Sequence, residues 1–124
     1  MNGKMSNDGL SRTGGDGLRK RLDEAEVLLG TVLQLRKDLH SEQVELPPVG
    51  EGAFERLRAG VLQVLEERQA RSAHAFGLVL NRVDLTETAY REAMRAGGLD
   101  ELAGRVVLRC LQKVLARERY AGRG

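Results

Sequence analysis

LRKRLDEAEVLLGTVLQLRKDL, residues 18–39, decides the fold class of this chain. Its apolar positions recur at alternating spacings of three and four residues, which is the period of one face of an α-helix. This seam comprises Leu18, Leu22, Ala25, Leu29, Val32, Arg36 and Leu39. Asp16 can cap the helix at its start, so we predict a helix over residues 17–40. Leu28 and Leu35 widen the seam, which is typical of a bundle helix and marks both leucines as candidates for an association interface.

A second long amphipathic helix is predicted over residues 52–83. Pro47 and Pro48 stop the first helix and make residues 41–50 a linker. Beyond the linker, one face at about 100° per residue holds Phe54, Leu57, Val61, Leu65, Ala75, Phe76, Val79 and Val83. A continuous helix here would reach about 45 Å. Arg68 and Ser72 lie on this apolar face, where the default interpretation is a side chain that snorkels to the rim or a helix end, and the sharper hypothesis is an association interface. We favour a continuous helix.

Two further helices are predicted in the remainder of the chain. Asp84 and Glu87 have the spacing of a capping box, and Thr86 is a competing cap, so a short helix is expected over residues 85–96. Gly97 and Gly98 should end it, because glycine readily takes the left-handed conformation that closes a helix. A last helix over residues 99–120 has apolar residues around more than half of its circumference and should be largely buried.

These elements predict an all-α fold, a small bundle of three to four helices in one domain over residues 18–120. Its 124 residues suit a single domain, and aromatics at 3% leave an aliphatic core. Residues 1–17 are expected to form a flexible leader and residues 121–124 a flexible end. Two long coiled-coil-like helices in so short a chain leave apolar surface to cover, so we expect a homodimer to complete the core.

A ridge of basic residues follows the last helix. Residues 105–124 hold six basic residues and one acid, although the whole chain has a net charge of only +2. The ridge comprises Arg105, Arg109, Lys113, Arg117 and Arg119. Like charges four residues apart repel, so the cations need acidic side chains of this chain, an acidic protein partner or nucleic-acid phosphates. Acidic residues just upstream favour internal pairing slightly.

No catalytic, cofactor or metal site is expected. His40 and His74 have no carboxylate or nucleophile at helical spacing, and no metal-binding spacing occurs. Cys110, the single cysteine, lies in the apolar arc of the last helix and should be a buried, inert thiol. A single cysteine agrees with a reducing compartment, so a cytoplasmic protein is expected. The chain has no apolar run near the roughly 18 residues that cross a bilayer, so no membrane contact is expected.

The sequence therefore favours a non-catalytic interaction module over an enzyme. It would be an adaptor, a regulator or a small subunit of a larger complex, without a small-molecule substrate. An apolar helix face would serve association, and the basic ridge would meet an acidic protein partner. The alternative is a helical subunit of a nucleoprotein complex that contacts phosphates without reading bases.

Overall fold

The computed structural model describes residues 17–123, with side chains described as far as residue 120. All regular elements in this range are helical, which confirms the predicted all-α class. The predicted leader and flexible end fall outside the described residues, apart from Gly17 and the backbone of residues 121–123. No helix of the described range is long and apolar enough to cross a membrane.

The first predicted helix is divided in the structure, which differs from the single helix expected over residues 17–40. A helical turn at residues 17–20 leads into the 3₁₀-helix η1 (Arg21–Asp23), and α2 (Ala25–Leu39) follows. Glu24 between them is extended, with φ −92° and ψ 120°. This break keeps Leu22 in the core at 1% exposure. His40 closes α2 in the left-handed conformation, with φ 51°.

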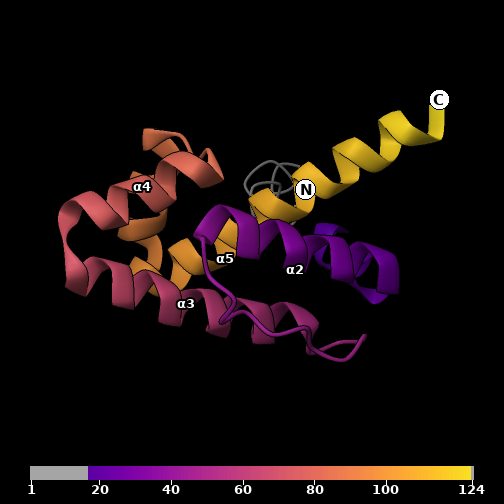
Figure 1. Cartoon of the computed structure of the whole chain (residues 1–124), viewed down its shortest axis with the longest axis horizontal. Coiled ribbons are helices and arrows are strands. Elements are labelled where there is room, and N and C mark those ends of the chain that lie inside the picture. The colour runs from indigo at the N-terminus through magenta and orange to yellow at the C-terminus, as the bar shows by residue number, and fades with distance from the viewer. Residues whose placement is uncertain (1–16, 124) are drawn as a thin grey trace, which may run out of the picture.

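The second predicted helix is also two helices, so the expectation of continuity was wrong. α3 (Ala53–Arg71) and α4 (Ala73–Val83) meet at Ser72, whose backbone is extended. The side chain of Ser72 accepts a hydrogen bond of 2.9 Å from the backbone N–H of Ala75 and so caps α4. The two helices form the corner at the left of Figure 1. A polar residue on the apolar face here marks the break.

The last two predicted helices are joined end to end in α5 (Glu87–Arg123). Thr86 caps its start, with its side chain accepting from the N–H of Ala89 at 3.0 Å, whereas Asp84 ends α4 at φ 69°. The predicted break at the glycine pair is confirmed, because Gly98 interrupts the helix at φ 71° and ψ −148°. The α5 helix also extends beyond residue 120, where we had expected it to end.

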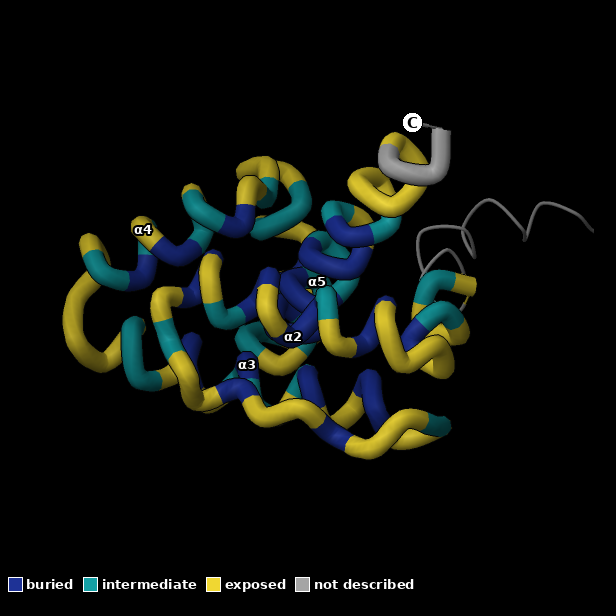
Figure 2. The backbone as a smooth tube through the Cα atoms, turned by 45° about the vertical axis from the view of Figure 1, so that its right-hand side comes forward, coloured by how far each residue is buried: buried dark blue, intermediate teal, exposed yellow. Residues whose placement is uncertain are grey.

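The helices share one apolar core, in which α5 packs most extensively against α3 and α2. α2 packs against α3, α4 and α5, and buried residues occupy a broad arc of its circumference (Figures 1 and 2). α5 approaches α2 closely at Gly30, where an added Cβ would lie 3.0 Å from a methyl of Val114. Beyond Leu115 the helix leaves the core, and residues 116–120 are exposed.

Candidate interaction surfaces

The N-terminal part of the basic ridge, Arg105 and Arg109, is paired with acids of the same chain. Nε of Arg105 lies 3.1 Å from the carboxylate of Glu101, one turn earlier on α5. Arg109 reaches Asp84 at the end of α4, donating to its carboxylate at 3.0 Å and to its backbone carbonyl at 3.3 Å. These pairs confirm that the acids just upstream of the ridge neutralise part of it. Both guanidiniums would have to leave these acids before they could bind an external anion.

Lys113 is bound more deeply, in a polar cluster among α2, α4 and α5. Its Nζ lies 2.6 Å from Oδ2 of Asp38, and these side chains are 19% and 8% exposed. Nζ also donates to the carbonyl of Arg82 at 3.2 Å. Asp38 accepts further hydrogen bonds from the Gln34 amide at 3.0 Å and from the Cys110 thiol at 3.5 Å. The cluster joins three helices and presents little charge to solvent.

Cys110 is the buried thiol that the sequence predicted. Burial raises the pKa of its thiol far above the ordinary range, and the neighbouring Asp38 carboxylate raises it further. The nearby cations Lys113 and Arg109 act in the opposite direction but do not offset these effects. A thiol that keeps its proton is a poor nucleophile and a poor metal ligand. Cys110 therefore serves as a small core residue and hydrogen-bond donor.

The C-terminal part of the basic ridge, Arg117 and Arg119, makes fewer contacts with the rest of the chain. Arg117 donates to the side-chain carbonyl of Gln34 at 2.7 Å. Glu118, the single acid of this stretch, pairs with Arg21 of η1 at 3.1 Å. Arg119 is exposed and has no ion-pair partner within the described part of the chain. The structure thus brings four of the five predicted ridge residues into contacts inside the chain.

Arg68 and Ser72, proposed for an association interface, have roles within the chain. Arg68 donates to the carbonyls of Leu39 and His40 at 2.9 and 3.1 Å, and its guanidinium pairs with Glu67. Carbonyls at a helix C-terminus lack partners within the helix, so Arg68 caps the end of α2. Ser72 caps α4 in turn. Arg68 meets a helix end and not an acid across an interface.

Leu28 and Leu35 are buried when the chain is folded, so they cannot contact a partner. They are 1% and 0% exposed and lie in the core. The predicted seam runs beside the buried arc and not along its middle. Leu29, which we assigned to the seam, is 45% exposed, and Leu33 is 53% exposed. The apolar surface of α2 is therefore on the side opposite to Leu28 and Leu35.

We call this surface the outer stripe of α2 and define it as Glu26, Leu29, Gly30, Leu33 and Lys37. All five lie within about 100° of the helix circumference at 3.6 residues per turn. Gly30 is half-buried and the other four are exposed. Neither Glu26 nor Lys37 has an ion-pair partner among the side chains that the structure describes. Sequence reasoning missed this stripe because it placed Leu29 in the core and gave Leu33 no role.

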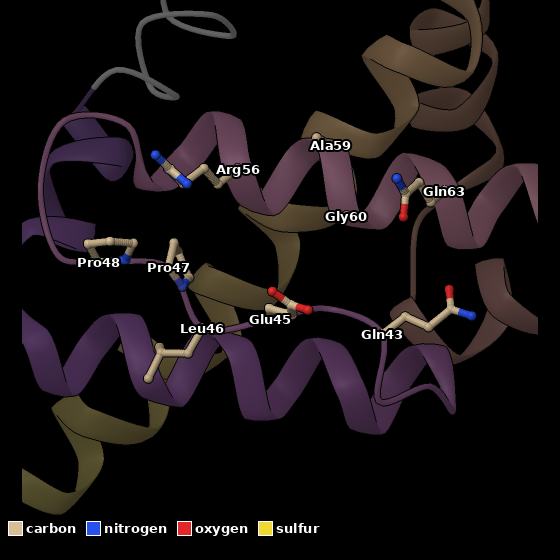
Figure 3. Close-up of a pocket in the computed structure, with 9 residues that line it drawn as sticks. All are labelled: Gln43, Glu45, Leu46, Pro47, Pro48, Arg56, Ala59, Gly60 and Gln63. Carbon is tan, nitrogen blue, oxygen red and sulfur yellow. The ribbon is translucent and has the colours of Figure 1, made fainter.

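Two open grooves accompany these surfaces. The first has a volume of about 480 Å³ and lies between the extended segment 43–48 and α3 (Figure 3). Its lining combines the polar side chains of Gln43, Glu45, Arg56 and Gln63 with prolines and small residues. The second, of about 620 Å³, lies between α4 and the start of α5 beside Phe76 and Tyr90.

The titratable side chains in the two linings are Glu45 and Arg56 in the first groove and Glu87 and Tyr90 in the second. Histidines are absent from both linings, and His40 and His74 are exposed elsewhere. Within the described residues, no three histidine, cysteine or acidic side chains gather in a possible metal site.

Comparisons with protein-family models, curated proteins and solved structures found no match.

Proposed function

We propose that this protein is a non-catalytic helical interaction module whose binding surface is the outer stripe of α2. It would act as an adaptor, a regulator or a small subunit of a larger complex. The observation that supports this proposal most is the pair Leu29 and Leu33. They lie one turn apart on one stripe and are both about half exposed, on a helix whose opposite side fills the core.

Single exposed leucines are common on protein surfaces and need no explanation. A pair at a spacing of four residues is a different case, because both side chains can enter one apolar surface of a partner helix. The charged residues Glu26 and Lys37 frame the pair. An apolar centre with a polar rim is the usual composition of a protein interface.

The basic ridge is a weaker candidate for the binding surface. Binding an acidic partner or a phosphate backbone would require Arg105, Arg109 and Lys113 to leave their present acids. If Lys113 left in this way, the buried carboxylate of Asp38 would lose its counter-ion, which is costly in free energy. The nucleoprotein alternative would rest mainly on the exposed Arg119 and Arg117, too few cations for tight phosphate binding.

The proposal is tested by capturing partners from the native cell with two variants of the tagged full chain. Leu33→Glu places a charge in the centre of the outer stripe. Leu78→Glu makes the same change at a leucine of α4 that is 40% exposed and serves as the matched control. Lysates are treated with nuclease, so that partners bridged by nucleic acid are lost.

We expect the control to recover the same partners as the unaltered chain, and Leu33→Glu to lose them. Equal recovery by both variants would show that the outer stripe is not the binding surface. Loss of all partners on nuclease treatment alone would favour the nucleoprotein alternative. Circular dichroism establishes that both variants remain folded.

A further inference from the structure

We infer that the outer stripe of α2 binds a second copy of this chain, with the two α2 helices antiparallel across a two-fold axis between residues 31 and 32. This inference rests on the proposed function and deepens it by naming the partner. Its basis is the order of side chains along the stripe, which is self-complementary under that symmetry.

The charges of the stripe match when the two helices are antiparallel. The axis brings Glu26 of one copy opposite Lys37 of the second copy, and the same contact recurs on the other side of the axis. The two residues of one copy are about 16 Å apart at 1.5 Å per residue, so both contacts form together. In a parallel pair, Glu26 would face its own counterpart, and so would Lys37. Charge therefore selects the antiparallel orientation.

The apolar positions match in the same register. Leu33 of one copy lies opposite Gly30 of the second copy, and Leu29 lies next to Leu33 of the second copy across the axis. Val114 of the same copy fills the space beside the Cα of Gly30, so Leu33 of the second copy would pack on the backbone at Gly30 and on the edge of Val114. Four half-exposed leucines, two from each copy, would lose contact with water at the centre of the interface.

The interface is small, because each copy contributes mainly one helix of 15 residues. Interfaces of this size belong to the weak, transient class. A dissociation constant on the order of 10–100 µM is expected, so the chain should be monomeric when dilute and dimeric when concentrated. The charge pairs at the rim should make this association weaker at high salt.

Sedimentation equilibrium of two opposite charge reversals tests both the partner and the orientation. Glu26→Lys leaves two lysines in the stripe of each copy, and Lys37→Glu leaves two glutamates. Either variant alone should dimerise at least about tenfold more weakly than the unaltered chain, because two attractive contacts become repulsive. An equimolar mixture should recover association, because each lysine then faces a glutamate in the antiparallel register.

Recovery in the mixture, with Leu78→Glu associating like the unaltered chain, would support the inference. A mixture no more associated than either variant alone would overturn it, as would an unaltered chain that remains monomeric up to millimolar concentration. If the chain stays monomeric while Leu33→Glu still loses captured partners, this inference fails and the proposed function stands, with a different protein on the stripe. If Leu33→Glu changes neither association nor capture, both fail.

Discussion

Nζ of Lys113 lies 2.6 Å from Oδ2 of Asp38, and this contact joins α5 to α2 inside the polar cluster. Both side chains are largely withdrawn from solvent, and the carboxylate also accepts from Gln34 and Cys110. Lys113, a member of the predicted basic ridge, is therefore part of the internal structure. The stability of the chain should depend on it.

Replacing Lys113 by methionine should destabilise the chain strongly. Removing one partner of a buried ion pair leaves an uncompensated charge, which typically costs about 3–5 kcal/mol. Lys20→Met, at an exposed lysine just before η1, is the matched control and should change the free energy of unfolding by less than about 0.5 kcal/mol. Urea denaturation followed by circular dichroism measures both. Equally small losses of unfolding free energy in the two variants would mean that the ion pair between Lys113 and Asp38 does not stabilise the chain.

Cys110 should resist alkylation in the native protein. Its raised thiol pKa leaves almost no thiolate at pH 8, and the side chain is inaccessible. We expect iodoacetamide to label it slowly in buffer and rapidly in denaturant, as followed by intact mass. Fast labelling of the folded chain would contradict the buried position.

The same raised pKa makes stability depend on alkaline pH. Above the thiol's ordinary value of 9.0, Cys110 ionises in the unfolded chain but keeps its proton in the folded one. The contribution of the protonated thiol to the free energy of unfolding is thus fully present below pH 9. It is lost as the pH rises, by up to about 1.4 kcal/mol per pH unit. Cys110→Ser, which does not titrate there, should show a shallower loss of stability from about pH 9 to 11. Identical slopes would refute this linkage.

Ser72→Ala should lower stability by about 1 kcal/mol, since it removes the cap of α4. Ser72→Asp can accept the same hydrogen bond and should therefore retain most of the stability that the cap provides. Thermal denaturation distinguishes this structure from the continuous helix we expected, because alanine in a helix interior would raise the melting temperature.

Gly98→Ala should destabilise the chain by about 1–3 kcal/mol, because the backbone there has φ 71° and ψ −148°. Gly77 provides the control, as it lies within α4 and a Cβ there would meet nothing within 4 Å. Gly77→Ala should be neutral or stabilising by up to about 1 kcal/mol. A neutral Gly98→Ala would indicate that the break in α5 is not required.

Local patterns were enough to predict the helical class and the break at Gly97 and Gly98. They also signalled the break at Ser72, through a polar residue on an apolar face, although we favoured continuity. The break at Glu24 has no glycine or proline to mark it. It follows from packing that keeps Leu22 in the core, which a three-and-four spacing does not reveal.

The candidate surfaces were harder to predict, because they depend on which face of each helix the rest of the chain covers. Lys113 and Asp38 are 75 residues apart, so no pattern within one helix joins them. The periodicity of α2 allowed either Leu28 or Leu29 to point inward. Contacts from α3, α4 and α5 decide between them and leave the outer stripe exposed.

The most direct test of the outer stripe is light scattering of the unaltered chain and Leu33→Glu over a range of concentrations. The monomer mass is 13.7 kDa. We predict that the mass of the unaltered chain rises toward twice this value as it is concentrated, while Leu33→Glu keeps the monomer mass and the same helicity. A mass that stays at 13.7 kDa for both, or rises equally for both, would contradict self-association of the chain through this stripe.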